Sequence, residues 1–201
     1  HYTEGIQNWN PIWPNHGIRI LPGPSSMWFD ARGTRLPAPY LPGFDTLGTL
    51  KYLQNTGFTY SWFILTQKII KKEFALSGSE QNPDITDKDY WRVLKRLFGS
   101  KAPDPVEAFK KYGKDFLVSD NLETLVDKMN ELSGENLLDY KKIKEQIDAR
   151  DCELDNNYSK DTQVNYIRNT RKYMGDRLGR VAALHKILDP KNGPLIAVRL
   201  H

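Results

Sequence analysis

The sequence predicts an α+β fold in which a small, mostly antiparallel sheet is covered by about five or six helices. Three observations lead to this prediction. Seven of the twelve prolines fall within residues 1–45, which have the pattern of short strands joined by turns. From Thr46 onward the apolar residues recur at helical spacing, and the chain finishes with the alternating apolar run 195–200. The change between the two patterns lies near residue 50.

The composition is that of a globular protein. Hydrophobic residues make up 39% and charged residues 27% of the 201 residues, which is enough apolar material for a buried core. No apolar stretch approaches the roughly 20 residues that a membrane-spanning helix requires. The single cysteine, Cys152, cannot form an internal disulfide, so we expect a reducing, cytoplasmic setting.

The first part of the chain is predicted to contain short strands and a hairpin. Residues 18–21 and 27–30 are strand-like in composition. The segment 27–36 is predicted to form a hairpin, because Gly33 stands where the turn needs a left-handed backbone conformation.

Helices are predicted over most of the remaining chain. The expected segments are one through Tyr52 and Leu53, one over 61–74, one after Asp87, one over 106–112 ending at Gly113, one after Asp120, one over 138–150 and one over 160–173. Asp120 is the predicted N-cap of the clearest helix, with Glu123 completing a capping box. The apolar stripe of that helix is Leu122, Leu125, Val126 and Met129. Residues 151–158 are polar and are predicted to form a surface loop.

The two ends of the sequence suggest a piece of a larger protein. The chain starts at His1 without a methionine and stops at His201, directly after the apolar run 195–200. A strand in this run would have backbone groups that need a neighbouring strand. We therefore expect the function to depend on further polypeptide as much as on this chain.

The positive charge leaves one alternative open. The net charge is +4 and the isoelectric point is near 9.0, which is compatible with a stand-alone α+β module that binds a protein or polyanionic partner. Lys68, Lys71 and Lys72 lie among apolar residues at helical spacing, so they are more simply the solvated face of a helix. We therefore expect no nucleic-acid partner.

Recognisable catalytic motifs are absent from the sequence. It has no GxGxxG, GxxxxGK[ST], HExxH, GxSxG or CxxC pattern. The four histidines, at positions 1, 16, 185 and 201, lack the spacing of metal ligands. The sequence thus predicts no metal site and no self-contained catalytic apparatus.

Several segments nevertheless resemble one superfamily of flavoproteins. Residues 27–36, MWFDARGTRL, are similar to the strand–turn–GxR[FL] segment of the fumarate reductase and 3-ketosteroid dehydrogenase superfamily. Residues 119–126 with Leu137 and Leu138 resemble its capping-domain stretch, and residues 193–198 resemble the strand that returns to the flavin domain. More narrowly, residues 15–30 and 61–68 resemble a bacterial group of FAD-binding dehydrogenases.

The resemblance implies the capping region of a two-domain FAD-dependent oxidoreductase. Residues 1–50 would form a strand and turn region at the seam between domains, residues 51–193 the helical part of the cap, and residues 194–201 the returning strand. The cap would close over the flavin, with the FAD domain of the same protein as its partner and a small organic or steroid-like molecule as substrate. The resemblance places the main FAD-binding segments outside this chain, so the chain alone would be inactive.

Two positions differ from well-known members of the superfamily. Fumarate reductases carry a proton-donating arginine shortly after the GxR[FL] element, where this sequence has Phe44 and Asp45. Ketosteroid dehydrogenases carry a tyrosine in the returning strand, where this sequence has Leu195 and Ile196. The resemblance therefore leaves the substrate and the proton donor open.

Candidate site residues follow from these positions. Tyr40 and Asp45 are the catalytic candidates, because they occupy the loop that carries the proton donor in relatives. The substrate-binding candidates are His16, Arg19, Ser25, Ser26, Arg199 and His201. The alternative for each is structural: serines in a turn usually satisfy local hydrogen bonds, and arginines on strands are often only surface charges.

Overall fold

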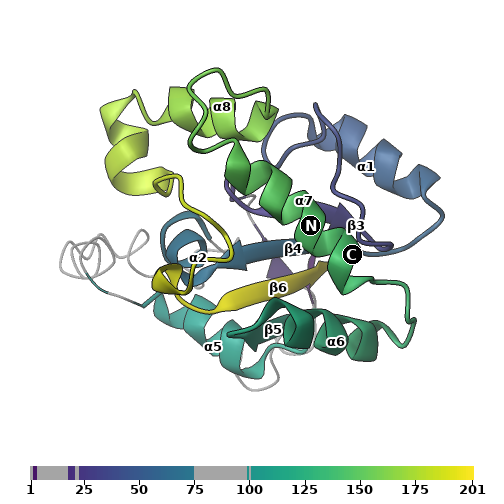
Figure 1. The fold of residues 1–201 in the computed structure, drawn as a ribbon. Helices are drawn as coiled ribbons and strands as arrows, with labels where there is room; N and C mark the ends of the chain where they lie inside the picture. The colour runs from purple at the N-terminus through teal and green to yellow at the C-terminus, as the bar shows by residue number, and fades with distance from the viewer. Residues whose placement is uncertain (1, 4–17, 21–22, 75–98, 100) are drawn as a thin grey trace.

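A four-stranded antiparallel sheet crosses the middle of the molecule in the order β3-β4-β6-β5 (Figure 1). The computed structural model describes residues 2–3, 18–20, 23–74, 99 and 101–201. The sheet is formed by β3 (Met27–Asp30), β4 (Ser61–Thr66), β5 (Phe116–Ser119) and β6 (Leu195–Leu200). A second, two-stranded sheet pairs β1 (Tyr2–Thr3) with β2 (Ile18–Arg19). The predicted α+β class with a small antiparallel sheet is confirmed.

Strand β6 lies inside the sheet. All six of its residues pair with β4, and Leu195–Val198 also pair with β5 on the other side. The final apolar run therefore finds its neighbouring strands within this chain. Its burial on both faces explains why Leu, Ile, Ala and Val follow one another there.

Strand β4 corrects the helix that the sequence predicts over residues 61–74. Residues 61–66 form the strand, all six of them buried, and only α2 (Gln67–Glu73) is helical. A short apolar run has the same appearance in a buried strand and in a buried helix, and the pairing of β4 with both β3 and β6 decides the outcome. Phe63 packs edge-on against Trp28 of β3, with ring centroids 4.9 Å apart.

The helices cover the two sides of this sheet. Their bounds are α1 (Thr46–Asn55), α2, α5 (Asp104–Tyr112), α6 (Leu122–Ser133), α7 (Tyr140–Cys152) and α8 (Thr162–Thr170), with a π-helical turn η2 (Asp176–Arg180) and a 3-10 turn η3 (Pro190–Asn192). In Figure 1, α5 and α6 lie below the sheet, whereas α1 and α8 lie above it. Within the described residues, no helix has both the length and the apolar character needed to cross a bilayer.

Most predicted helices are confirmed, with shifted ends. Helix α5 ends at Gly113, and the stripe Leu122, Leu125, Val126 and Met129 of α6 is buried. The N-cap of α6 is Asn121, whose side chain accepts the Thr124 N–H, so the prediction of Asp120 was wrong by one residue. Both residue types cap well, and only the backbone geometry distinguishes them. The helix predicted after Asp87 lies outside the described residues.

The surface loop predicted for residues 151–158 starts later in the structure than the sequence suggests. Asp151 and Cys152 still belong to α7, and Asp151 is buried with a relative exposure of 6%. Its carboxylate pairs with Arg150 at 2.7 Å and accepts the Ile187 N–H at 2.7 Å. A polar residue is thus buried here because the adjacent Arg150 and the distant Ile187 N–H supply its partners.

The turn after β3 has the predicted form. Gly33 has φ +70°, and an isolated antiparallel bridge joins Phe29 to Arg35. A Cβ atom on Gly33 would lie 3.1 Å from Ile143 of α7, so the turn packs closely against that helix. This contact fixes the loop that follows, which forms one wall of the candidate site.

Candidate functional site

A pocket of about 280 Å³ lies between the loop after β3 and the N-terminus of α8. It is lined from the loop by Arg35, Leu36, Pro37, Ala38 and Leu41, and from α8 and the residues before it by Lys160, Asp161, Thr162 and Gln163. The loop supplies most of the apolar wall, whereas the α8 side is polar. Its volume is near the lower end of the range for small-molecule sites, which begins at roughly 300 Å³.

An ion pair joins the two walls of the pocket. Arg35 donates to Asp161 at 2.6 Å and to the Gln163 side-chain oxygen at 2.8 Å. Burial opposes the ionisation of Asp161, but the hydrogen bond and charge of Arg35 outweigh it and lower the pKa of this carboxyl below its usual value. Asp161 also caps α8 by accepting the Val164 N–H. The pair therefore holds the helix terminus and the loop in one arrangement.

Gln163 connects the pocket to the turn before β3. Its side-chain nitrogen donates to the backbone oxygens of Pro24 and Ser26, at 2.9 and 2.8 Å. Its oxygen accepts from Arg35, so both ends of the amide are engaged by neighbours. The pocket wall and the turn containing Ser25 and Ser26 are consequently one connected polar network.

Glu73 is the buried acid of this network. Its carboxylate accepts from the Ser25 N–H at 2.8 Å, the Ser25 hydroxyl at 2.6 Å and the Ala182 N–H at 2.7 Å. Burial raises the pKa of Glu73 to about 7, against the lowering effect of these hydrogen bonds. The group can exchange a proton near neutral pH, and its relative exposure is only 7%. In the neighbouring turn, the hydroxyl of Ser26 is buried without a hydrogen-bond partner.

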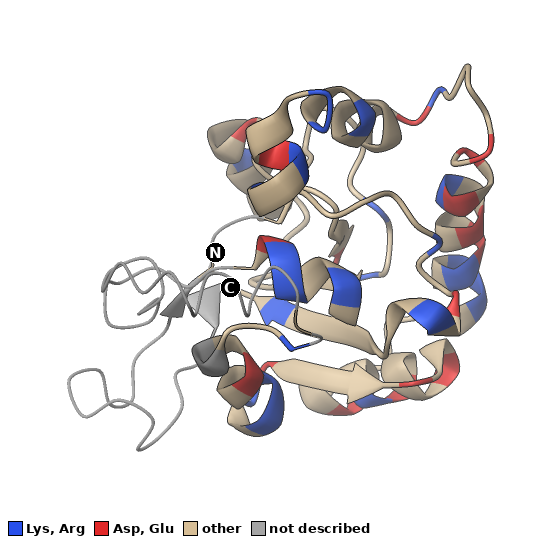
Figure 2. Cartoon of the chain, turned by 90° about the vertical axis from the view of Figure 1, so that its left-hand side faces the viewer, with Lys and Arg blue, Asp and Glu red and all other residues tan. Residues whose placement is uncertain are grey.

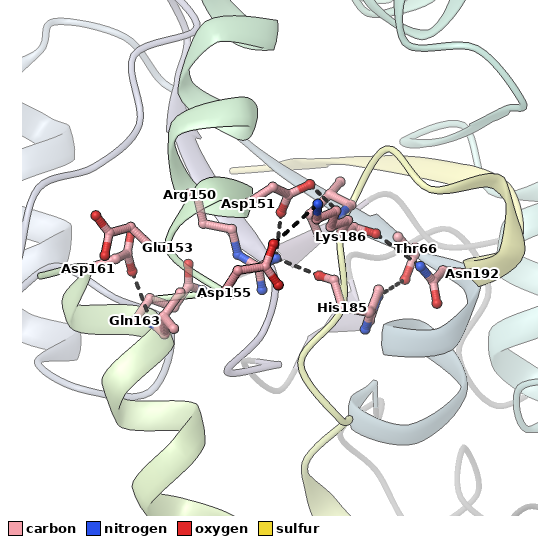
Figure 3. Close-up of polar contacts among 12 residues, drawn as sticks. Thr66, Arg150, Asp151, Glu153, Asp155, Asp161, Gln163, His185, Lys186 and Asn192 are labelled. Atoms are coloured by element: carbon pink, nitrogen blue, oxygen red, sulfur yellow. Dashed lines mark hydrogen bonds and ion pairs between the residues drawn. The ribbon is translucent and has the colours of Figure 1, made fainter. Parts of the chain in front are cut away.

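A second buried polar network lies at the C-terminal end of α7 (Figure 3). Arg150, 1% exposed, donates to Asp151 at 2.7 Å and to the His185 backbone oxygen at 2.6 Å. The Nδ1 atom of His185 faces the Ala183 carbonyl, which can only accept, so Nε2 accepts the Thr66 hydroxyl at 2.8 Å. Burial lowers the pKa of His185 to about 4. This imidazole is therefore neutral at physiological pH and fixes the segment before η3 to β4.

The structure gives the two catalytic candidates different surroundings. Tyr40 is half-buried, and its ring stacks on Tyr52 with centroids 4.7 Å apart. It lies in the loop that lines the pocket, between Ala38 and Leu41. Asp45 is exposed and caps α1 by accepting the Gly48 N–H at 2.8 Å. Its carboxylate thus already has a structural partner.

The substrate-binding candidates are distributed over both ends of the sheet. Ser25 and Ser26 lie in the network around Glu73, next to the pocket. Arg199 lies toward the opposite end of β6, where it pairs with Asp115 at 2.7 Å and donates to the Leu132 oxygen. His201 is 3.8 Å from the same carboxylate. His16 lies outside the described residues, and the backbone of Arg19 pairs with Tyr2 in the small sheet.

Sequence reasoning missed four residues that organise the site. Arg35 appears in the GxR[FL] segment but was not selected, and Asp161 and Gln163 were counted within a helix. Glu73, which follows two lysines, was not among the predicted site residues. A signal for its burial exists, because Glu73 stands three and four residues after the buried Ile70 and Ile69.

Metal ligands are not grouped in this region. Among residues 23–74 and 101–201, and the few others that the structure describes, no three His, Cys, Asp or Glu side chains are placed to hold one ion. The polar groups of the site instead pair with one another. Their hydrogen bonds hold the polar wall of the pocket in place, and Glu73 can retain a proton.

The family model and the curated relatives that match this chain both point to flavoproteins. A family model described as FAD binding domain matches residues 1–201. KsdD-like steroid dehydrogenases from two Mycobacterium tuberculosis strains, CDC 1551 and H37Rv, are 56% and 55% identical over the whole chain. The KsdD-like steroid dehydrogenase of Mycolicibacterium smegmatis is 55% identical. The chain spans 36 to 37% of the length of these relatives. No solved structure gives a significant match.

Proposed function

The chain belongs to the FAD binding domain family, and from this premise we propose that it is the substrate-capping, catalytic region of an FAD-dependent dehydrogenase. The reaction class we propose for the whole protein is hydride transfer between a small organic or steroid-like substrate and flavin. The steroid-like substrate is inferred from the names of relatives at 55 to 56% identity. The site residues described above would shape and close the substrate side of the active site.

The observation that carries this proposal is the topology of the sheet. A dinucleotide is usually held by parallel strands joined through helices, with a glycine-rich turn at the helix N-terminus. In the described residues every strand pair is antiparallel. The strands and helices thus support a domain that accompanies a flavin domain. This reading agrees with a chain that spans about a third of its relatives.

The described residues do not fit FAD as a self-sufficient site. The pocket beside Arg35 has about 280 Å³, which is below the usual size even for drug-sized ligands. Two of its charged groups, Arg35 and Asp161, pair with each other, which leaves the exposed Lys160 as the lining cation outside that pair and gives little positive charge to neutralise a diphosphate. A flat apolar ring against Leu36 and Leu41 matches this wall better than a dinucleotide does.

Within this proposal Tyr40, which adjoins the pocket-lining Leu41, handles the proton. Its loop forms the apolar wall of the pocket, and Tyr52 holds its ring by stacking. A phenol can donate a hydrogen bond to a substrate carbonyl; where the substrate is reduced it supplies the proton that accompanies the hydride, and where the substrate is oxidised its phenolate accepts that proton. Asp45 would act on this loop from a distance, by fixing the start of α1. We propose Tyr40 as the catalytic group and Asp45 as a positioning residue.

A chimera tests the proposed function directly. The matching third of the Mycolicibacterium smegmatis relative is replaced by this chain, and the purified protein is examined for visible flavin absorption and for steroid-dependent bleaching of that absorption. We expect a yellow protein that is bleached by a steroid substrate, and a colourless isolated chain. If the isolated chain binds FAD tightly, the chain is itself the flavin-binding domain and the capping role is excluded.

One observation favours a second candidate, a module that binds polyanions. Residues 168–180 contain five basic residues and one acidic residue, whereas the rest of the chain has 24 of each. Lys172, Arg177 and Arg180 are exposed in this segment. Elsewhere basic and acidic residues are interspersed on the helices (Figure 2). Salt-dependent retention of the isolated chain on heparin, lost in an Arg177→Glu/Arg180→Glu variant, would favour this candidate.

A further inference from the structure

Residues 172–180, called here the η2 tip, form an exposed turn that is both apolar and basic. Its large apolar side chains are Tyr173, Met174 and Leu178, with relative exposures of 71, 70 and 60%. Its basic residues, all of them exposed, are Lys172, Arg177 and Arg180. In Figure 1 the tip is the yellow-green turn at the upper left, beyond the end of α8.

The apolar side chains of the η2 tip lie close together. Met174 and Leu178 are four residues apart in a helical stretch, in which the Arg177 N–H donates to the Tyr173 oxygen at 3.0 Å. About one turn therefore separates Met174 from Leu178, and the two lie on the same side of the stretch. The Tyr173 ring packs against Gly175, where an added Cβ atom would lie 2.9 Å from the ring. The tip thus presents one small apolar cluster with cations beside it.

The backbone of the η2 tip is held by polar side chains from two other elements. Arg171, at the end of α8, donates to the backbone oxygens of Arg177 and Val181. Lys72 of α2 donates to the same Arg177 oxygen at 2.8 Å. None of the five residues of η2 is buried. These hydrogen bonds fix the course of the backbone, whereas the apolar side chains stay on the outside.

The charge of this region favours an anionic partner. Residues 168–180 contain five basic residues and one acidic residue, Asp176, which pairs with Arg180 at 3.7 Å. A cluster of large exposed apolar side chains marks an interaction site, either with a protein or with a membrane.

Two features favour a membrane surface over a protein. Charged residues are depleted at the centres of protein interfaces, and three apolar side chains are few for a stable protein contact, which buries roughly 1,200–2,000 Å². An anionic lipid surface needs no complementary shape, because it attracts cations and admits shallow insertion of apolar side chains. Tyrosine is a residue that is enriched at the level of the head groups.

We propose that the η2 tip binds the surface of a membrane that contains anionic lipids. Its three apolar side chains insert at the level of the head groups, and its three cations lie against the lipid phosphates. This inference goes beyond the proposed function and does not depend on it. For that function, the contact brings the dehydrogenase to the phase in which an apolar, steroid-like substrate dissolves.

The test measures sedimentation of the isolated chain, and of the chimera described above, with lipid vesicles. The vesicles consist of phosphatidylglycerol and phosphatidylcholine in equal parts, or of phosphatidylcholine alone. The first variant, Met174→Ser/Leu178→Ser, removes apolar side chains from the tip without changing its charge. Its matched control is Leu47→Ser/Leu50→Ser, which changes two apolar residues of α1 with relative exposures of 65 and 48%.

A second pair of variants separates the charge of the tip from the net charge of the chain. Arg177→Glu/Arg180→Glu reverses two charges of the tip. Lys51→Glu/Lys141→Glu changes the net charge equally at two exposed lysines elsewhere. Thermal unfolding of every variant verifies that the fold is retained.

We expect the chain and the chimera to bind the mixed vesicles roughly 10-fold or more tightly than phosphatidylcholine vesicles. Both variants of the tip should lose roughly 10-fold or more of this affinity, and both controls should keep it. If Met174→Ser/Leu178→Ser binds as tightly as the parent, charge alone explains the binding and the proposal is overturned. An equal loss in the controls also overturns it.

The chimera supplies a further decisive outcome. If the isolated chain binds the mixed vesicles and the chimera does not, the rest of the protein covers the η2 tip and the proposal is rejected. Vesicle binding is measured without reference to flavin or steroid, so a failure of the proposed function is recognised separately, by a colourless chimera.

Discussion

Glu73 accepts hydrogen bonds from both the backbone N–H and the hydroxyl of Ser25, a residue 48 positions earlier in the chain. The same carboxylate accepts the N–H of Ala182 from the segment after η2. One buried acid thus holds together α2, the turn before β3 and the chain leading to His185. The contact also places the serine turn beside Gln163 and the pocket.

The buried carboxylate gives the first prediction, which concerns pH. The pKa of Glu73 is raised from 4.5 to about 7 by burial, so between these values the folded state holds a proton that the unfolded state has released. The contribution of Glu73 to the free energy of unfolding is therefore full below pH 4.5, falls as the pH rises to about 7, and does not change further above that pH. Its total loss is up to about 3 kcal/mol. Urea unfolding at a series of pH values measures this slope.

The variant Glu73→Gln removes the titrating group and is expected to flatten that part of the profile. The matched control is Glu145→Gln, which changes an exposed glutamate on α7. A Glu73→Gln profile that keeps the full slope would show that other groups cause it.

The neutral imidazole of His185 gives a prediction of opposite sign. Its pKa is lowered by burial from 6.5 to about 4, so the folded state binds fewer protons than the unfolded state in this interval. Its contribution to stability is full above pH 6.5 and is lost as the pH falls toward 4. His185→Gln keeps a hydrogen-bonding side chain without the titration, and its stability should fall less between pH 6.5 and 4 than that of the parent chain. Nuclear magnetic resonance titration of the ring protons provides a direct value.

The ion pair between Arg35 and Asp161 predicts that removing one partner lowers the free energy of unfolding. Asp161→Asn retains the cap of α8 but leaves the guanidinium half-buried without its charged partner, at a cost of about 1–3 kcal/mol. Arg180→Ala is the control, because its ion pair with Asp176 is 3.7 Å long and Arg180 is 82% exposed; such a pair contributes at most about 1 kcal/mol. Chemical denaturation of both variants makes the comparison, and equal effects would contradict a structural role for the Arg35 pair.

The turn at Gly33 predicts that an alanine costs more stability at Gly33 than at Gly134, although the two glycines have similar backbone conformations. Gly33 and Gly134 have φ +70° and +69°, but a Cβ atom at Gly33 would lie 3.1 Å from Ile143, whereas at Gly134 nothing lies within 4 Å. Gly134→Ala should cost the conformational penalty of about 1–2 kcal/mol. Gly33→Ala should cost about 1 kcal/mol more, because Ile143 and Leu138 must also shift. Equal melting temperatures for the two variants would exclude a tight contact between the turn and α7.

The proposed proton donor is tested in the chimera. Tyr40→Phe removes the hydroxyl and retains the ring that stacks on Tyr52, so kcat should fall by roughly 10²-fold or more with little change in KM. Tyr52→Phe is the control, since it retains the stacking and changes only the neighbouring hydroxyl. A Tyr40→Phe chimera with the kcat of its parent would assign the proton transfer to another group.

The sequence predicted those parts of the fold that local patterns encode. Helices α5 and α6 were found because their apolar residues recur at helical spacing, and α5 ends at a glycine. The turn at Gly33 followed from a single residue that tolerates a positive φ. In the site, the sequence singled out the Ser25–Ser26 turn and the Tyr40 loop, both of which lie at the pocket or in its polar network.

The rest depended on contacts between distant segments. The strand β4 was predicted as a helix, because a short buried run of Trp, Phe, Ile and Leu has no period that identifies it, and only its pairing with β3 and β6 makes it a strand. Glu73 and Asp161 have polar side chains that local reasoning places in water. They are buried or half-buried because Ser25, Ala182 and Arg35 supply their hydrogen bonds from far along the chain. Local periodicity therefore determined the helices and one turn, whereas long-range pairing decided the sheet and the polar network, because a buried polar group is stable only where the tertiary structure provides its partners.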